Sequence, residues 1–248
     1  MQTTYAKGYS HALRKTHGAN KPPLLMKELI EYFTKSDGRV LDPFVGVGGT
    51  LIGASICDTP REAVGIELDP QWKPVYEEVC ENDDLAPQEF IVGDCLEEMT
   101  NLEPESFDFV AMDPPYNLHF EKTMCDEKYD KSVRKSTYRT GSGEDADFAQ
   151  SENYDEFLHR MFLCFEQCFR VLKPGAWMNV IVRNCYQNGE YTMVNADLAK
   201  EAREVGFTLK GEKMWSPVGA PLRPYGYPYS YVPNLIHQHI IIFQKPKK

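Results

Sequence analysis

The chain has 248 residues and a net charge of −10, with 42% hydrophobic and 26% charged residues. This hydrophobic fraction is large enough to form a core, so the composition excludes a globally disordered chain. No apolar run approaches the roughly 20 residues that cross a membrane, and the N-terminus lacks the apolar segment of a secretory signal. Seven cysteines without a repeated spacing are typical of a reduced, intracellular protein. We expect one domain over residues 1–248.

The basic residues are concentrated in three stretches that contain no Asp or Glu, residues 1–21, 131–143 and 213–248. The rest of the chain therefore carries all 37 acidic residues. A basic surface on an acidic protein forms only if these stretches meet in space. Their relative position is thus the first test of any nucleic-acid function.

From residue 38 onward, strand-like segments alternate with helical ones, which predicts a mostly parallel sheet with helices on its faces. The predicted helices cover residues 22–35, 51–57, 71–82, 154–172 and 194–205, and the predicted strands cover 39–42, 63–67, 90–93, 107–113, 177–183, 207–215 and 235–244. Lys173-Pro174-Gly175 is expected to end a helix. Residues 117–151 and 216–233 are predicted loops, the second rich in Pro and Tyr and short enough to join an antiparallel pair.

A glycine-rich turn follows the first predicted strand, in the sequence DPFVGVGGT over residues 42–50. Gly46 and Gly48 allow a sharp turn and a close approach of the backbone to a ligand. Glu67 ends the next strand, a spacing that suits a carboxylate accepting hydrogen bonds from both ribose hydroxyls. The spacing is not that of a dinucleotide site or a P-loop, so an adenosyl ligand without phosphate fits better. The alternative is a tight turn with Glu67 at a solvated strand end.

Two further motifs follow the third and fourth predicted strands. Asp94 either accepts a hydrogen bond from an adenine amino group or caps a helix. Asp113-Pro114-Pro115-Tyr116 combines a carboxylate and an aromatic face with two prolines that remove backbone donors and fix carbonyl acceptors. This combination predicts a site for a planar exocyclic amino group, whereas the motif by itself would equally fit a proline turn.

In this combination and order, the motifs resemble those of the DNA amino-methyltransferases, which transfer a methyl group from S-adenosylmethionine to adenine N6 or cytosine N4. The resemblance covers residues 15–245 and rests on DPFVGVG (42–48), GIELDP (65–70), GDC (93–95), DPPY (113–116), HGANKPPLLM (17–26) and VLKPG (171–175). The chain departs from the family in two respects. The cofactor half precedes the catalytic half, which permutes the usual order, and we expect no separate target-recognition domain after the last predicted strand.

The resemblance implies a Rossmann-like class I methyltransferase fold of the α/β class. Its sheet has seven mostly parallel strands in the order 3-2-1-4-5-7-6, with strand 7 antiparallel and helices on both faces. The resemblance implies S-adenosylmethionine as cofactor. His237 and His239 lie two apart without a further Cys, His or Asp cluster at ligand spacing, so we expect no metal. The resemblance assigns to the cofactor Lys21, Asp42, Phe44, Gly46, Gly48, Thr50, Glu67, Asp94 and Cys95. It assigns to catalysis Asp113, Pro114, Pro115 and Tyr116, with Tyr116 stacked on a base that has left the duplex.

The implied topology places the loops after the fourth and sixth strands at the carboxyl edge of the sheet. We therefore predict that these loops and the N-terminal arm, residues 1–21, surround one cleft. The residues predicted to contact nucleic acid are Lys131, Arg134, Lys135, Arg139, Arg223, Tyr225 and Tyr227. The cations would bind phosphates and the tyrosines would stack on bases. The alternative for the Pro/Tyr-rich loop is a lid with no nucleic-acid role.

The resulting prediction is a DNA methyltransferase that acts on adenine N6, because within the family Asp in the first position of the catalytic motif occurs more with adenine enzymes. Three alternatives stay open: a cytosine-N4 enzyme, an RNA guanine-N2 methyltransferase, and an inactive cofactor-binding subunit that presents nucleic acid to a partner. The expected partner is DNA, with RNA, a partner subunit and a homodimer left open and no membrane expected.

Overall fold

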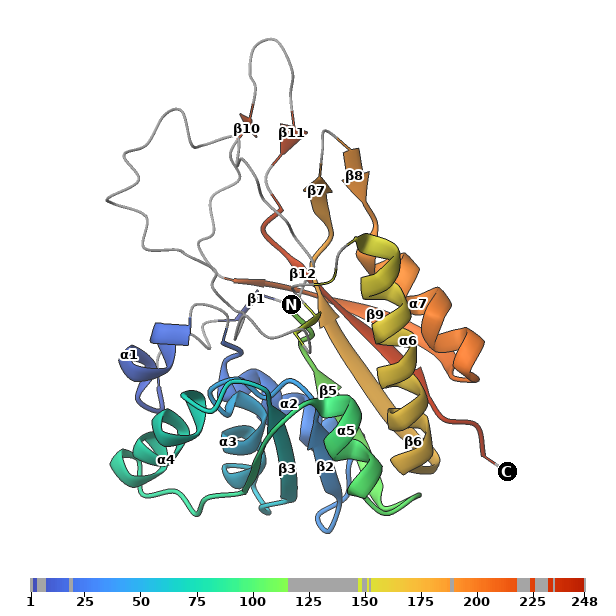
Figure 1. Ribbon diagram of the computed structural model, residues 1–248. Coiled ribbons are helices and arrows are strands. Elements are labelled where there is room, and N and C mark those ends of the chain that lie inside the picture. The colour runs from blue at the N-terminus through green and yellow to red at the C-terminus, as the bar shows by residue number, and fades with distance from the viewer. Residues whose placement is uncertain are drawn as a thin grey trace.

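The computed structural model describes residues 2–3, 8–17, 20–115, 147–148, 151, 153–187, 190–217, 224–225, 232–233 and 235–247. Its centre is an eight-stranded sheet in the order β1-β9-β12-β6-β5-β2-β3-β4 (Figure 1). The strands are β1 (Gln2–Thr3), β2 (Arg39–Asp42), β3 (Glu62–Glu67), β4 (Glu89–Val92), β5 (Phe107–Met112), β6 (Leu172–Val182), β9 (Thr208–Pro217) and β12 (Gln238–Gln244). Among the described residues there are also two small antiparallel pairs, β7 (Cys185–Gln187) with β8 (Glu190–Thr192) and β10 (Pro224–Tyr225) with β11 (Val232–Pro233).

The predicted strand order 3-2-1-4-5-7-6 is confirmed. Strands β2 to β6 pair in parallel, and β12, the predicted strand 7, runs antiparallel to both of its neighbours β6 and β9. The sheet gains one strand that the sequence did not predict, because β1 pairs in parallel with the end of β9. Two residues are too few to show the alternation by which strands are found in a sequence.

Strand β6 begins five residues earlier than predicted, directly after the last residue of α6. The Lys-Pro-Gly turn does end the helix, but it lies inside the strand as a bulge. Leu172 pairs with Phe107 and Trp177 pairs with Phe109, so the register against β5 shifts in between. Gly175 has a φ of 82°, a conformation that glycine adopts without strain. The sequence suggested a turn between the helix and the strand. In the structure, these residues form a bulge within the strand instead.

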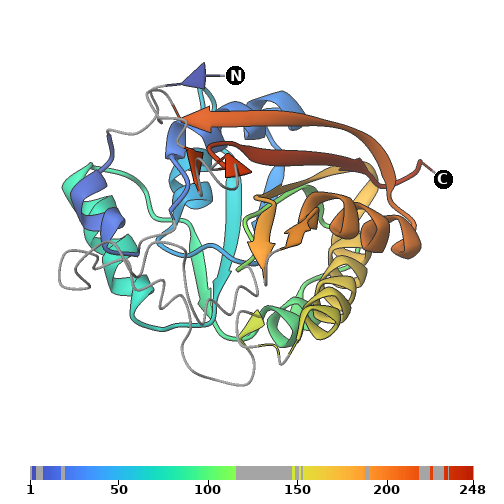
Figure 2. The same ribbon diagram turned by 90° about the horizontal axis from the view of Figure 1, so that it is seen from above.

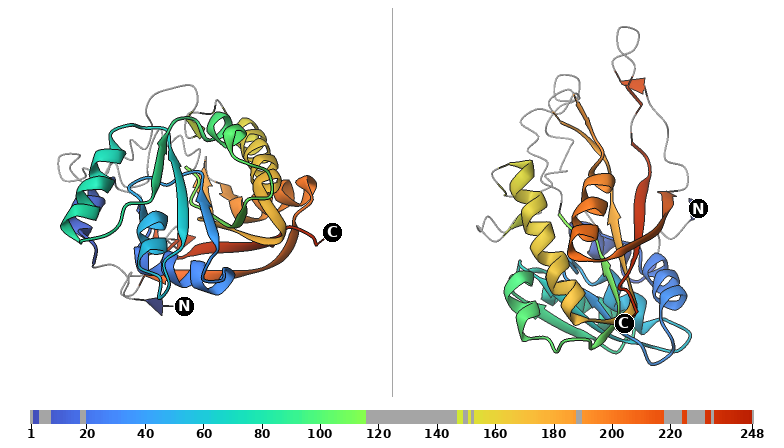
Figure 3. Two further views of the ribbon diagram at one scale, coloured as in Figure 1. Left: turned by 90° about the horizontal axis from the view of Figure 1, so that it is seen from below. Right: turned by 90° about the vertical axis from the view of Figure 1, so that its right-hand side faces the viewer.

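Helices cover both faces of the sheet (Figure 3). On one face lie α2 (Pro23–Phe33), α3 (Gly49–Ser55) and α4 (Trp72–Asn82), and on the other α5 (Cys95–Glu98), α6 (Tyr154–Val171) and α7 (Val194–Val205). Along β6, Met178, Val180 and Val182 pack toward α6, while Ile181 packs toward α2. This alternation follows from the two-residue period of a strand. Short helices at α1 (His11–Arg14), η1 (Lys15–His17) and η2 (Met99–Asn101) complete the described part.

The long predicted helices have the ends that their sequences indicate. The Asn153 side chain caps α6 by accepting a hydrogen bond of 2.9 Å from the Glu156 N–H. Helix α7 ends at Gly206, which has a φ of 119°. Among the residues that the structure describes, no helix is both long and apolar enough to cross a membrane.

Candidate active site

The glycine-rich turn joins the end of β2 to the start of α3. Gly46 and Gly48 have φ values of 53° and 80°, in the region that side chains with a Cβ rarely adopt. A Cβ at position 48 would also overlap the ring of Tyr76 on α4. The turn therefore depends on glycine at this position, as the sequence predicted.

This dependence can be tested by substitution. We expect Gly48→Ala to lower the free energy of unfolding by about 1–3 kcal/mol or more, because the strained φ adds to the overlap with Tyr76. Gly8→Ala is the matched control, since a Cβ at position 8 would meet no atom within 4 Å. Chemical denaturation of both variants measures the difference, and equal stability would contradict the proposed packing.

Glu67, the last residue of β3, holds the glycine turn in place. One carboxylate oxygen accepts a hydrogen bond from the Gly46 N–H and the other accepts one from the Asp69 N–H, each at 3.0 Å. Burial raises the pKa of Glu67, and these two N–H groups oppose the shift. Glu67 is thus a largely buried carboxylate at the turn rather than a solvated strand end.

Asp42 is a second carboxylate in this region and is only 4% exposed. Its oxygens accept hydrogen bonds from the Phe44 N–H at 2.9 Å and from the Thr50 hydroxyl. Burial raises the pKa of Asp42 to about 7, the two hydrogen bonds oppose this shift, and the charges of Asp113 and Glu67 add to it. The hydrogen bonds that Asp42 accepts from Phe44 and Thr50 therefore stabilise the turn. The carboxylates of Asp42, Glu67 and Asp113 lie close enough for their charges to interact. The Phe44 ring lies edge-on against Phe148, with centroids 5.1 Å apart.

Of the two alternatives for Asp94, the helix cap is observed. Its side chain accepts a hydrogen bond of 2.9 Å from the Leu96 N–H at the start of α5. A contact with an adenine amino group stays a prediction. The Cys95 side chain lies in the core beside Cys164, where burial raises its pKa well above the ordinary value. A cofactor contact of Cys95 also stays a prediction.

Asp113 follows β5 directly, and Lys21 forms an ion pair with it through Nζ and Oδ2. The side chains are 10% and 15% exposed. The sequence predicted Lys21 at the cofactor, which stays a prediction, and the structure places its ammonium on the predicted catalytic carboxylate. The two residues are 92 positions apart, so no spacing in the sequence indicates the pair. Pro114 is buried next to Asp113.

The sequence did not predict the position of His17. A Cβ on Gly46 would lie 3.3 Å from two atoms of the His17 ring, and that ring meets Trp72 edge-on at 4.6 Å between centroids. The His17 ring therefore packs against the glycine turn at Gly46. The sequence signal for this position is the HGANKPPLLM motif, which begins with His17.

Several predicted residues lie outside the described part of the chain. They are the catalytic Tyr116 and the nucleic-acid residues Lys131, Arg134, Lys135, Arg139, Arg223 and Tyr227. Tyr225 lies in β10, where its backbone pairs with Val232. The roles of all eight stay predictions, and so does the meeting of the three basic stretches.

Asp42, Glu67 and Asp113 stand at the ends of β2, β3 and β5, three parallel neighbouring strands, and so at one edge of the sheet. The residues present fit S-adenosylmethionine, because carboxylates accept hydrogen bonds from ribose hydroxyls and suit a positively charged sulfonium. Within the described ranges, no group of three His, Cys, Asp or Glu residues could hold a metal ion.

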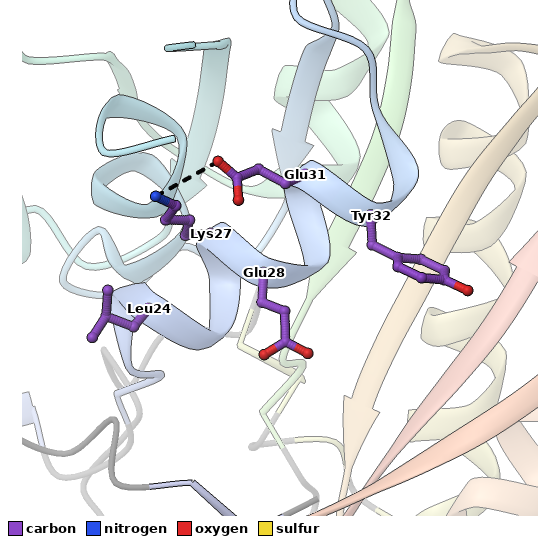
Figure 4. Close-up of a pocket in the computed structure, with 5 residues that line it drawn as sticks. All are labelled: Leu24, Lys27, Glu28, Glu31 and Tyr32. Carbon is purple, nitrogen blue, oxygen red and sulfur yellow. Dashed lines mark ion pairs between the residues drawn. The ribbon is translucent and has the colours of Figure 1, made fainter. Parts of the chain in front are cut away.

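A surface hollow lies elsewhere, on the outer side of α2, and contains none of the predicted site residues. It is lined by Leu24, Lys27, Glu28, Glu31 and Tyr32, and an ion pair of 3.7 Å joins Lys27 to Glu31 (Figure 4). Its open shape does not suit a buried adenosyl group. The carboxyl edge is therefore the candidate active site.

Comparison with known proteins identifies the family. A family model described as DNA methylase matches residues 2–78 and 107–248. The chain belongs to the DNA methylase family. YubD of Escherichia coli (strain K12), named as a methylase, is 37% identical over 65 residues, which are 26% of this chain and 28% of YubD.

Two solved structures show the same fold. TrmN from Thermus thermophilus has a TM-score of 0.57 at 15% identity, over 94% of this chain and 51% of that one. An S-adenosylmethionine-dependent methyltransferase from Methanosarcina mazei has a TM-score of 0.51 at 15% identity, over 89% and 98%. The chain thus spans about half of TrmN and less than a third of YubD. The Rossmann-like methyltransferase fold is confirmed. Membership of the DNA methylase family supports the predicted cofactor, S-adenosylmethionine.

Proposed function

We propose that the chain transfers a methyl group from S-adenosylmethionine to the exocyclic amino group of a base in DNA, with adenine N6 as the target. The observation that carries this proposal is the position of Asp113. It lies with Pro114 at the same sheet edge as the glycine turn and is close enough for its charge to raise the pKa of Asp42. The Asp113 carboxylate, the proposed acceptor, thus lies near the glycine turn that we assign to the cofactor.

In this proposal Glu67 holds the ribose of the cofactor. Each carboxylate oxygen has two acceptor sites, so Glu67 can accept two hydroxyl hydrogen bonds while it keeps its bonds to Gly46 and Asp69. When bound, S-adenosylmethionine supplies a methyl group on a positively charged sulfur. When ionised, the Glu67 carboxylate favours a cation here.

Asp113 and the Pro114 carbonyl would accept hydrogen bonds from the two amino hydrogens of the base. These bonds make the nitrogen more electron-rich and aim its lone pair at the methyl carbon. The nitrogen would gain the methyl carbon as the carbon–sulfur bond breaks, which would leave a neutral thioether, and it would release one proton to solvent. No covalent bond to the protein would form. Alignment of this kind supplies about 7–11 kcal/mol in favourable cases. The base must be unpaired or flipped out of the duplex to reach the site.

Counting the label in each polymer tests this function. The purified protein is incubated with methyl-labelled S-adenosylmethionine and, separately, duplex DNA, single-stranded DNA and RNA. We expect label in DNA. Label in RNA alone would contradict the proposal and favour guanine-N2 methylation, and no label in any polymer would favour an inactive subunit.

A separate prediction concerns the phosphate contacts of the loop after β5. Neutralising Lys131, Arg134, Lys135 and Arg139 should weaken DNA binding and flatten its salt dependence by roughly 0.9 in log–log slope per lost duplex contact. S-adenosylmethionine affinity should not change. A fluorescence titration of DNA at several salt concentrations measures the slope.

The matched control neutralises four other cations, Lys35, Lys200, Arg203 and Lys210. Lys35 precedes β2 and Lys210 lies near the start of β9, so these two lie toward the opposite edge of the sheet. The control changes the net charge equally and should leave the slope nearly unchanged. Equal slopes in both variants would contradict a specific role for the loop and would favour recognition by a partner subunit.

A further inference from the structure

The N-terminal segment, defined here as residues 8–17 and 20–22, covers the glycine turn and lies along α4 (Figure 2). Two contacts attach it to α4. The Ser10 hydroxyl donates a hydrogen bond of 2.6 Å to Asp83 at the C-terminal end of the helix, and the His17 ring meets Trp72 at its start. The segment thus spans the whole length of α4.

Arg14 lies inside this segment and is only 1% exposed. Its guanidinium donates to the carbonyls of Tyr9 at 2.7 Å, Gly8 at 3.0 Å and Lys21 at 3.4 Å, and to the Asn20 side chain at 3.2 Å. Burial lowers the pKa of Arg14, but an arginine remains charged in a protein. A buried charge is tolerated only when its donors are satisfied, and here the partners lie on both sides of α1. Arg14 therefore ties the two ends of the segment together.

Lys21 connects this arrangement to the candidate active site. Its carbonyl accepts from Arg14 and lies against α3, since a Cβ on Gly49 would be 2.7 Å from it. Its ammonium forms the ion pair with Asp113. One residue therefore contacts the buried arginine, the first turn of α3 and the proposed catalytic carboxylate.

We propose that Arg14 is a positioning residue for methyl transfer, which fixes the N-terminal segment so that Lys21 orients Asp113. This inference rests on the proposed role of Asp113. An ammonium bound to Oδ2 restricts the rotation of the carboxylate, so the acceptor for the target amino group is held ready. A misplacement of about 1 Å at a reacting group can reduce the rate by about 100-fold, so loss of this support should reduce turnover.

The experiment is a double-mutant cycle with Arg14→Met, Lys21→Met and the double variant. Each single variant should lower kcat by roughly 10- to 100-fold with a smaller change in KM for DNA, because the acceptor is misaligned rather than removed. The double variant should be no slower than the slower single variant, because both changes remove the same support. Lys21→Arg should recover part of the kcat, since it restores a cation next to Asp113.

Arg61→Met is the matched control. Arg61 is also buried, at 8% exposure, and donates to the Thr34 and Thr59 carbonyls far from the three carboxylates. It should lower the unfolding temperature as Arg14→Met does and leave kcat of the folded protein near the wild-type value. If Arg14→Met does not fold, Arg14→Gln replaces it, because the amide keeps two donors.

Two outcomes would overturn the inference: kcat losses that multiply in the double variant, or an Arg14 variant whose kcat equals that of Arg61→Met. Asp113→Ala is measured in the same assay. Full activity there would refute the proposed function itself. An inactive Asp113→Ala with multiplying losses would refute only the role of Arg14.

Discussion

Replacing Asp113 by alanine is expected to abolish methyl transfer while S-adenosylmethionine still binds. Asp113 supplies the proposed acceptor for the target amino group, whereas Gly46 and Glu67 are joined by their own hydrogen bond of 3.0 Å. Loss of a group that acts on the reacting nitrogen should reduce kcat by about 1,000-fold or more, which corresponds to about 4 kcal/mol of barrier. Single-turnover transfer and calorimetric titration with the cofactor measure the two effects separately.

Asp108→Ala is the matched control for this variant. Asp108 lies at the other end of β5 and also binds a lysine, with Lys173 Nζ at 2.7 Å, and it accepts a hydrogen bond from the Arg39 N–H. Its replacement removes a comparable ion pair from the same strand and should lower stability without lowering turnover. If Asp113→Ala and Asp108→Ala had equal turnover, the role of Asp113 would be refuted.

Replacing Glu67 by alanine should weaken S-adenosylmethionine binding by about 100-fold or more. The estimate takes two lost hydrogen bonds to a charged group at about 1.5–3 kcal/mol each, and the loss also leaves the Gly46 and Asp69 N–H groups without this acceptor. Glu67→Gln should be milder, because its amide oxygen still accepts hydrogen bonds. Calorimetric titration with the cofactor measures the affinity.

Glu62→Ala serves as the control, since Glu62 is the exposed first residue of the same strand. It should bind the cofactor like the wild type. Unfolding curves of both variants show whether a loss of affinity comes from a loss of folded protein. Unchanged affinity in a folded Glu67→Ala would remove Glu67 from the cofactor site.

The sequence predicted the sheet because most residues of β2, β3 and β5 are buried, and clear turn and helix signals separate these strands. The order of these strands came from the family resemblance, and the structure confirms it. The early start of β6 could not be predicted, because Pro174 and Gly175 are typical of a turn and only the pairing of Leu172 with Phe107 makes them a bulge. Local signals thus identified the elements, and tertiary pairing set their limits.

The predicted site residues fall into two groups for a similar reason. Glu67 lies at a strand end beside the glycine turn, so spacing alone placed it correctly in the fold. The ion pair of Lys21 with Asp113 joins distant parts of the chain, and no local pattern encodes it. Arg14 binds mainly backbone carbonyls, which every residue has, so its position leaves no signature in the sequence.

Analysis of the labelled nucleoside tests the central claim most directly. DNA that has received label from the wild-type protein is digested to nucleosides, and the methylated product is identified by chromatography and mass spectrometry. We expect the label in N6-methyl-2′-deoxyadenosine. Label in N4-methylcytosine would refute the adenine assignment while leaving an amino group as the target. Label on a ring carbon of a base would contradict the proposal, because Asp113 and Pro114 are proposed to activate an amino nitrogen and not a ring carbon.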